Sequence, residues 1–179
     1  MDISSDLTEL GRTPIAVISA GIKSLLDIEK TLEYLETQGV CVVTYGLERA
    51  FPAFFTSKSK FEAPYNAVSA IEAAEIIHAG LDTTKSTSGI LFGIPIPEKY
   101  SLDSLTMEDA INHALSECKA KRIIGKDVTP YILAKLNELS NGKSLEANLG
   151  LIENNAKVGA EISEQLARLR SSGGCTSSQ

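Results

Sequence analysis

The chain has 179 residues, of which 43% are hydrophobic and 22% are charged, with a formal net charge of −6 at pH 7. This length and balance suit one domain with a real hydrophobic core, and they exclude a chain that is disordered throughout. The negative charge argues against a nucleic-acid groove as the main site, and no apolar run reaches the roughly 18–20 residues that cross a membrane.

The first part of the chain is typical of a strand–helix–strand unit. Residues 15–19 are short, apolar and β-branched, which predicts a buried strand. Residues 24–36 carry apolar side chains at helical spacing, and Ser24 and Asp27 have the spacing of a capping box. Residues 40–45 predict a second strand. Such a unit favours a parallel pair of strands in an α/β sheet.

The second part of the chain adds one clear strand and several helices. Residues 49–61 form a Phe-rich connection with room for one strand, and residues 89–94 predict a short buried strand that ends at Pro95. Helices are expected at residues 66–79 with Asn66 as the cap, at 106–121 from Thr106, at 129–139 from Thr129 and Pro130, and from Ser144 to about Leu169.

The last of these helices has the longest apolar pattern. Its apolar residues recur at helical spacing, which predicts an amphipathic helix. Residues 171–179 are rich in Ser and Gly and are expected to form a flexible tail, so one domain is predicted over residues 1–170. The predicted apolar stripe consists of Leu145, Leu149, Ile152, Ala156, Ile162, Leu166 and Leu169.

The cysteines indicate a reducing compartment. Cys41 lies in an apolar run, Cys118 lies at a helical apolar position, and Cys175 lies in the polar tail. An odd number of cysteines without a CxxC spacing is not typical of a disulfide framework or a zinc site. We therefore expect a cytoplasmic protein in which Cys41 and Cys118 pack as small core residues.

The start of the chain combines groups that suit chemistry on a phosphorylated sugar. Asp2 or Asp6 could hold a hard divalent cation through oxygen, and the serines between them could hold a phosphate. Lys23 follows a buried strand and a small-residue turn, where desolvation can remove its proton and make it a nucleophile toward a sugar aldehyde. The same residues also fit a solvated acidic terminus and a surface lysine.

Six ordered segments carry a resemblance to a known family. They are DISSDL from Asp2, SAGIKSLLDIEKTLEYLETQGV from Ser19, RAFPAFF from Arg49, GIPIP from Gly93, IIGKDVTPYILAKL from Ile123 and SLEANLGLIENNAKVGAEIS from Ser144. Together they resemble the C-terminal half of the pseudouridine-5'-phosphate glycosidases, the IndA-like family. The resemblance implies a layered α/β/α fold with a mixed, mostly parallel sheet that lacks the N-terminal half of the family fold. Such a half would leave an unpaired strand edge and an uncovered apolar face.

The resemblance also implies an activity, namely the reversible cleavage of pseudouridine 5'-phosphate to uracil and ribose 5-phosphate. Lys23 resembles the family's nucleophile, which forms an imine with C1 of ribose 5-phosphate after the sugar ring opens. Asp2 resembles the ligand of Mn²⁺. The residues that resemble the substrate-binding positions are Ser4, Ser5, Asp6 and Asn148, with Ser5 standing where the family more often has a small residue such as Ala.

Other parts of the family pattern do not map onto this chain. The family's proton-donor glutamate and a second substrate-binding lysine belong to the N-terminal half, and the full-length family is implied to form a homotrimer. Two alternatives to the enzyme therefore stay open at this point. One is an inactive fragment that keeps the family fold, and the other is a phosphosugar-binding module without catalysis.

Overall fold

The computed structural model describes residues 5–23 and 27–173. In this part of the chain the strands form one sheet in the order β1-β4-β2-β3, and every pairing is parallel, so no antiparallel strand of a mixed sheet occurs here. The predicted strands are confirmed, but β4 lies between β1 and β2. The bounds are β1 (Ala16–Ser19), β2 (Cys41–Tyr45), β3 (Tyr65–Ala67) and β4 (Ile90–Gly93).

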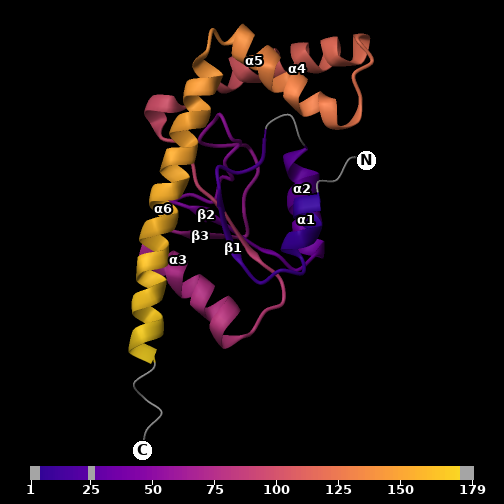
Figure 1. The fold of residues 1–179 in the computed structure, drawn as a ribbon. Coiled ribbons are helices and arrows are strands. Elements are labelled where there is room, and N and C mark those ends of the chain that lie inside the picture. The colour runs from indigo at the N-terminus through magenta and orange to yellow at the C-terminus, as the bar shows by residue number, and fades with distance from the viewer. Residues whose placement is uncertain (1–4, 24–26, 174–179) are drawn as a thin grey trace, which may run out of the picture.

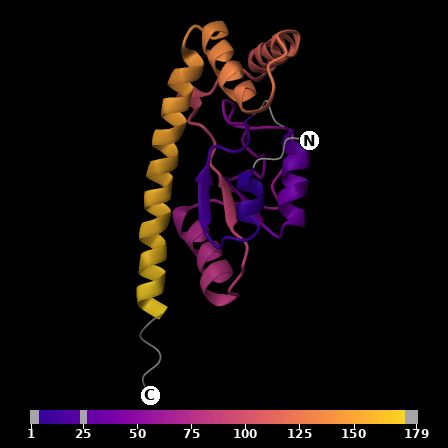
Figure 2. The same ribbon diagram turned by 45° about the vertical axis from the view of Figure 1, so that its right-hand side comes forward.

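Helices cover both faces of the sheet, which confirms the layered α/β/α fold (Figures 1 and 2). One face is covered by α1 (Ser5–Leu10) and α2 (Ile28–Thr37). The other is covered by α3 (Ala70–Ile77), which continues as the π-helix η1 (His78–Thr83), and by α6 (Lys143–Gly173). A helical extension lies beyond one end of the sheet and contains η2 (Glu98–Tyr100), α4 (Ser104–Ala120), η3 (Gly125–Asp127) and α5 (Val128–Leu139).

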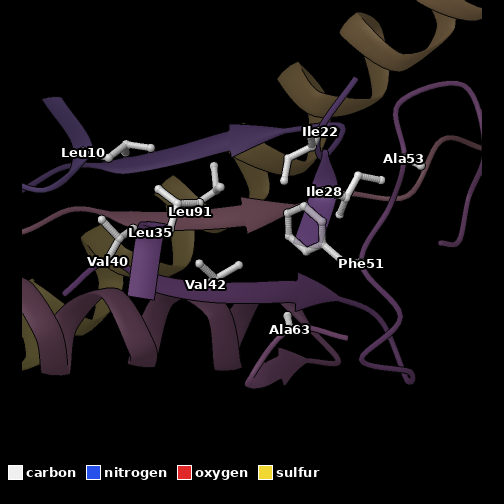
Figure 3. Packing of buried hydrophobic residues seen from close by; sticks show 10 residues of the cluster. All are labelled: Leu10, Ile22, Ile28, Leu35, Val40, Val42, Phe51, Ala53, Ala63 and Leu91. Carbon is white, nitrogen blue, oxygen red and sulfur yellow. The ribbon is translucent and has the colours of Figure 1, made fainter. Parts of the chain in front are cut away.

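Alternation along the strands divides the core into two layers. Successive side chains of a strand point to opposite faces of the sheet. Leu91 and Val42 pack with residues of α1 and α2 (Figure 3), while Phe92 and Val43 pack with residues of α3 and α6. Each such buried side chain contributes about 1.5–3 kcal/mol to folding. Every residue of β4 is buried, as expected for a central strand covered on both faces.

A third cluster joins the helical extension to the sheet. It packs Met107 and Ile111 of α4 against Ile132 and Leu136 of α5 and against Leu151 of α6. The residue that follows β1, Ala20, belongs to the same cluster. The extension is therefore anchored where β1 ends.

The cap predicted for the helix after residue 66 is wrong, because Asn66 lies in β3. Its amide nitrogen donates to the carbonyl oxygen of Gly46, 2.9 Å away, beyond the end of the neighbouring strand. Ser69 caps α3 instead, since its hydroxyl accepts from the amide nitrogen of Glu72 at 3.2 Å. The helix also runs past its predicted end at Gly80, because η1 continues to Thr83.

Two other helices begin at an aspartate cap. Asp27 caps α2 by accepting from the amide nitrogen of Lys30 at 3.1 Å, and the predicted start at Ser24 lies outside the described residues. Asp103 caps α4 by accepting from the amide nitrogen of Thr106 at 2.8 Å, so this helix begins two residues before the predicted one. Helices α5 and α6 begin within one residue of the predicted starts.

The apolar stripe predicted for the last helix is partly wrong. Leu145, Leu149 and Ile152 are 54%, 62% and 55% exposed, because a neighbouring face of α6 turns toward the core. The helix also extends to Gly173, into the segment predicted to be a tail. The buried face consists of Ala147, Leu151, Val158 and Ile162.

The cysteines of the described part pack as predicted. Cys41 is half-buried, and burial raises the pKa of its thiol, which disfavours the reactive thiolate. Cys118 is buried, and Cys175 lies outside the described residues. Within residues 5–23 and 27–173, none of the helices is both long enough and apolar enough to cross a membrane.

An ion pair between η1 and α6 should make stability depend on pH. Arg170 donates to both carboxylate oxygens of Asp82 at 2.7 and 2.9 Å, and His78 Nδ1 lies 3.0 Å from Asp82 Oδ2. Arg170 and then His78 lower the pKa of Asp82 from 3.8 to about 2. Because the folded-state pKa lies below the ordinary value, the ionised carboxylate stabilises the fold above about pH 4, and this stabilisation is lost as the pH falls toward 2.

We therefore expect Asp82→Asn to lower the free energy of unfolding at neutral pH and to have little effect near pH 2. Urea denaturation of both proteins over a pH series measures the difference. Glu164→Gln is the control, because Glu164 pairs with Arg168 only on the exposed surface of α6, where such pairs contribute little. A loss for Asp82→Asn that is the same at every pH would contradict the prediction.

Candidate functional site

The carboxyl ends of the parallel strands meet at one edge of the sheet, which we call the carboxyl edge. Ligands of open parallel α/β sheets bind at this edge, outside the strand ends. Here β1 ends at Ser19, β4 at Gly93 and β2 at Tyr45. The residues that sequence reasoning selected can now be placed relative to this edge.

Lys23 lies just beyond β1, at the end of a short segment of residues 20–23 that we call the lysine segment. This segment pairs antiparallel with the Phe-rich connection. The backbone amide of Phe54 donates to the carbonyl oxygen of Ala20 at 3.1 Å. The lysine is therefore carried by a backbone that is held by a segment distant in sequence.

Gly21 makes this pairing possible. Its φ is +85°, in the left-handed region that favours glycine, and a Cβ at this position would lie 1.9 Å from the carbonyl oxygen of Pro52. The same carbonyl accepts from the amide nitrogen of Ile22 at 3.3 Å. Only a residue without a side chain allows the two backbones to approach this closely.

The side chain of Lys23 is half-buried and lies against an aromatic wall. Its Nζ is 5.8 Å from the centroid of the Phe54 ring. The rings of Phe54 and Phe55 pack edge to face, with centroids 4.8 Å apart. The amine is thus shielded on one side, while its partial exposure leaves access for a small carbonyl compound.

Asn155 of α6 also holds the lysine segment, and sequence reasoning missed this role. With its amide oriented to satisfy both neighbours, its oxygen accepts from the amide nitrogen of Ala20 at 3.2 Å and its nitrogen donates to the carbonyl oxygen of Leu151 at 3.3 Å. The adjacent Asn154 donates to the carbonyl oxygen of Pro95 at 3.4 Å, beyond the end of β4. The sequence did contain a signal for such a role, because Asn is unfavourable inside a helix and two asparagines occur here in succession.

Ser5 and Asp6 lie in the first turn of α1, and the direction of this helix follows from a contact at its other end. The carbonyl oxygen of Leu10, at the end of α1, accepts from the amide nitrogen of Gly89 just before β4. Helix α1 therefore ends at the amino edge of the sheet and begins toward the carboxyl edge. Ser5 and Asp6 lie exposed in its first turn.

Of the three remaining predicted site residues, the structure describes Asn148. Asp2 and Ser4 lie outside the described residues. Asn148 is half-buried on α6, about 10 Å along the helix axis from Asn155 at 1.5 Å per residue. Among residues 5–23 and 27–173, no group of three or more His, Cys, Asp or Glu side chains could hold a metal ion. The expected Mn²⁺ ligand, Asp2, lies outside these residues, so the Mn²⁺ site stays a prediction.

Comparison with known sequences assigns this arrangement to a family. Residues 1–165 match the family described as indigoidine synthase A like protein. The chain is 51% identical over 169 residues to a pseudouridine-5'-phosphate glycosidase of Arabidopsis thaliana, and the match covers 94% of this chain and 51% of that protein. It is 48% identical over 168 residues to the enzyme of the same name from Clostridium botulinum, with 94% and 54% covered.

Solved structures show the same fold. A prealnumycin C-glycosynthase in complex with ribulose 5-phosphate superposes with a TM-score of 0.87 at 32% identity, covering 96% of this chain and 56% of that one. An indigoidine synthase A-like protein of Thermotoga maritima superposes with a TM-score of 0.79 at 34% identity, covering 90% and 53%. The chain spans about half the length of the curated relatives it matches.

Proposed function

Because the chain belongs to the indigoidine synthase A-like family, we propose that it carries the nucleophile part of a pseudouridine-5'-phosphate glycosidase site. The reaction is the reversible cleavage of the C–C glycosidic bond of pseudouridine 5'-phosphate to uracil and ribose 5-phosphate. The observation that carries the proposal is the position of Lys23, half-buried at the carboxyl edge on a segment clamped by Phe54 and Asn155.

Lys23 supplies the amine that is needed to form or cleave the C–C bond between the sugar and uracil. The lone pair of its Nζ adds to C1 of open-chain ribose 5-phosphate, and the adduct loses water to give an imine. In the synthetic direction a uracil carbon adds to the electrophilic C1 and loses its proton. The sugar hydroxyl then closes the ring on C1 and gives up its proton, and the amine of Lys23 leaves with a proton. In the cleavage direction an acid must protonate the departing carbon. The resemblance places that acid in the half of the family sequence that this chain does not span.

Trapping of the imine tests the proposal on the chain itself. Incubation with ribose 5-phosphate and borohydride should attach one reduced sugar phosphate to Lys23, detected by mass spectrometry of the peptides. An adduct that is absent, or spread evenly over surface lysines, would overturn the nucleophile assignment. Binding of ribose 5-phosphate without an adduct would instead favour a phosphosugar-binding module.

The substrate contacts are proposed from the resemblance and from their place in the fold. Ser4, Ser5 and Asp6 would bind the sugar phosphate near the start of α1, where Ser5 and Asp6 are exposed. Asn148 would meet the uracil, because an amide offers both a donor and an acceptor. The homotrimer and the cytoplasmic location are likewise proposals for the whole protein.

The hydrogen bond from Ala20 to Asn155 should affect the reactivity of Lys23. Asn155→Leu removes the acceptor, and we expect adduct formation to slow by roughly five- to tenfold, the equivalent of about one hydrogen bond. Asn155→Asp keeps an acceptor oxygen toward Ala20 and should recover most of the rate. The rate of borohydride trapping measures the effect, and thermal unfolding shows whether the fold is kept.

Asn154→Leu is the matched control for this prediction. It removes a side-chain hydrogen bond from the same turn of α6, but that bond ends on Pro95 and not on the lysine segment. A trapping rate that falls equally for Asn154→Leu and Asn155→Leu would show that helix packing, rather than the bond to Ala20, controls the rate.

We also propose that Asp2 binds Mn²⁺. A single carboxylate with several waters suits a cation that keeps much of its hydration, and the bound ion would supply positive charge to substrate oxygens. Asp2→Asn should weaken Mn²⁺ binding by about tenfold or more, because a neutral amide is a poorer ligand for a hard cation. Titration of the chain with Mn²⁺ measures the affinity, and Asp109→Asn, an exposed change on α4, is the control. Equal affinities for both variants would count against Asp2.

A further inference from the structure

The backbone of Phe54 is held in a conformation that a bulky side chain disfavours. Its φ is +66°, in the left-handed region that favours glycine. The amide nitrogen of Phe55 donates to the carbonyl oxygen of Ala53 at 2.8 Å, so Phe54 is the central residue of a hydrogen-bonded turn of three residues. A turn of this size with a positive φ at its centre is the rarer and more strained form of the γ-turn. Such strain persists only where the surrounding structure imposes it.

The strain at Phe54 does not serve to end a helix. Among the described residues other than glycine, a positive φ also occurs at Lys85, Arg122 and Asn141. Each of these directly follows the last cap of a helix, where left-handed backbone is common. Phe54 instead lies within the Phe-rich connection and has an aromatic side chain. Strain at such a residue points to a use for the side chain.

Contacts with two distant segments hold this turn in place. The amide nitrogen of Phe54 donates to the carbonyl oxygen of Ala20, just after β1, at 3.1 Å. The carbonyl oxygen of Phe55 accepts from the amide nitrogen of Leu102, between η2 and α4, at 2.9 Å. The ring of Phe54 also packs edge to face on Phe55, a side chain only 4% exposed. The Phe54 ring is therefore held in position relative to the end of β1.

This position places the ring beside the amine of Lys23. The Nζ of Lys23 lies over the Phe54 ring, 5.8 Å from its centroid, which is within the range of about 6 Å for attraction between a cation and a ring face. The face of a phenyl ring carries partial negative charge, so it attracts a positive charge on Nζ and has little effect on a neutral one. The half-burial of Lys23 strengthens the attraction, because water is partly excluded.

Imine formation creates a positive charge at this atom. The primary amine of Lys23 and the aldehyde at C1 of the open-chain sugar combine with one proton from solvent, and one water leaves. Nζ is then double-bonded to C1, carries one hydrogen and has a positive charge. This protonated imine is the electrophile that a uracil carbon attacks. A group that stabilises its charge therefore raises its population.

We propose that the ring of Phe54 stabilises the protonated imine on Lys23 and that the strained turn holds the ring there. The proposal rests on the proposed function of Lys23 and adds to it a group that stabilises the charge. An aromatic face suits this task, because it attracts the cation without offering a basic oxygen that could take up its proton.

Stepwise fluorination of the Phe54 ring tests the proposal in the full chain. Fluorine withdraws negative charge from the ring face and nearly keeps the shape of the ring, so the attraction for a cation weakens while the packing stays. Chains with mono-, di- or trifluorophenylalanine at this position are incubated with ribose 5-phosphate and limiting cyanoborohydride, which reduces the protonated imine. The rate of adduct formation on Lys23 should fall at each step, by about three- to tenfold in total, with little change in thermal unfolding.

The same fluorination at Phe61 is the matched control. The ring of Phe61 lies 5.1 Å from the Nζ of Lys60, so it also faces an amine, and its fluorination should leave the rate at Lys23 unchanged. Phe54→Tyr keeps an aromatic face and should keep most of the rate. Phe54→Leu keeps an apolar side chain without that face and should lose at least as much as the trifluoro variant.

Two truncations test the strained turn. Phe54→Gly and Phe54→Ala both remove the ring, so both should slow adduct formation by about threefold or more. The glycine variant should unfold at a higher urea concentration than the alanine variant, because glycine adopts a positive φ without cost. This is the reverse of the order expected at a position with ordinary backbone. An alanine variant as stable as the glycine variant would overturn the role of the turn.

A second aldehyde separates failure of this proposal from failure of the proposed function. Glycolaldehyde carries no phosphate, so its reaction with Lys23 needs no site for a sugar phosphate. If the rate with ribose 5-phosphate ignores fluorination, the role of Phe54 is overturned and the proposed function stands. If Lys23 reacts with glycolaldehyde alone and fluorination slows that reaction, the role of Phe54 stands although the proposed function fails. The absence of a Lys23 adduct with both aldehydes would overturn both proposals.

Discussion

Lys23→Ala is expected to abolish the borohydride-stable adduct with ribose 5-phosphate. In a protein that also carries the other half of the family sequence, the same change should lower turnover by about 10³-fold or more, because the imine needs this amine. Lys23→Arg should fail as well, since a guanidinium stays protonated and cannot form an imine. Mass spectrometry measures the adduct, and uracil release from pseudouridine 5'-phosphate measures turnover.

Lys99→Ala is the control for this change. The Nζ of Lys99 lies 4.5 Å from the centroid of the Tyr100 ring, so both lysines pack on an aromatic side chain. Loss of that packing alone should leave the adduct on Lys23 in place. Turnover of Lys23→Ala within tenfold of the wild-type value would show that Lys23 is not the nucleophile, provided that thermal unfolding of the two proteins is similar.

Gly21→Ala should be among the most destabilising single changes in the chain. Its Cβ would lie 1.9 Å from the carbonyl oxygen of Pro52, and the residue would have to keep a φ of +85°. Left-handed backbone costs about 1–2 kcal/mol for an L-residue, and the overlap adds about 1–3 kcal/mol, so we expect a loss of about 2–5 kcal/mol. Urea denaturation followed by circular dichroism measures the free energy of unfolding.

Gly142→Ala separates the two causes of that loss. Gly142 also has a φ of +85°, but no atom lies within 4 Å of the position that a Cβ would take. This variant should lose only the backbone part, about 1–2 kcal/mol. If both variants lose the same free energy of unfolding, the lysine segment can move away from Pro52 at little cost. The pairing between the lysine segment and the Phe-rich connection would then not be rigid.

The parts of the fold that depend on local sequence were predictable. Residues 15–19 and 40–45 are short, apolar and β-branched, and they form β1 and β2. Pro130 in the first turn marks the start of α5, because proline has no N–H to lose there. These signals need no knowledge of any distant residue.

The predictions from sequence fail where contacts with residues distant in the chain determine the local structure. Asn66 has the residue type of a helix cap, but its side-chain nitrogen donates to the carbonyl oxygen of Gly46, beyond the end of the neighbouring strand. The apolar residues of α6 occupy more than one side of the helix, so periodicity alone could not tell which side faces the core. Strand order has no local signal, which is why the position of β4 between β1 and β2 was not foreseen.

The residues of the candidate site likewise differ in whether they have a local sequence signal. Lys23 was selected from its motif after a strand and from the family resemblance, and its role as nucleophile stays a prediction. The two consecutive asparagines of α6 indicated a polar role but not its partner, because the bond from Ala20 to Asn155 forms only when α6 packs against the end of β1. Asn148 has the residue type that a base would need, yet it lies farther along the helix than the residue that contacts the lysine segment.

The strand order has a consequence for the way this chain folds. Strand β2 can pair with β3 soon after both are synthesised, but within the described sheet β1 has no neighbour until β4 is made. Pairing between segments so far apart in sequence costs loop-closure entropy before it is rewarded, which slows folding. Until β4 inserts, β1 and one side of β2 keep their backbone groups unpaired, so an unfinished or slowly elongating chain is open to aggregation during that interval. Insertion of β4 is the event that converts two separate halves of the sheet into one cooperative unit.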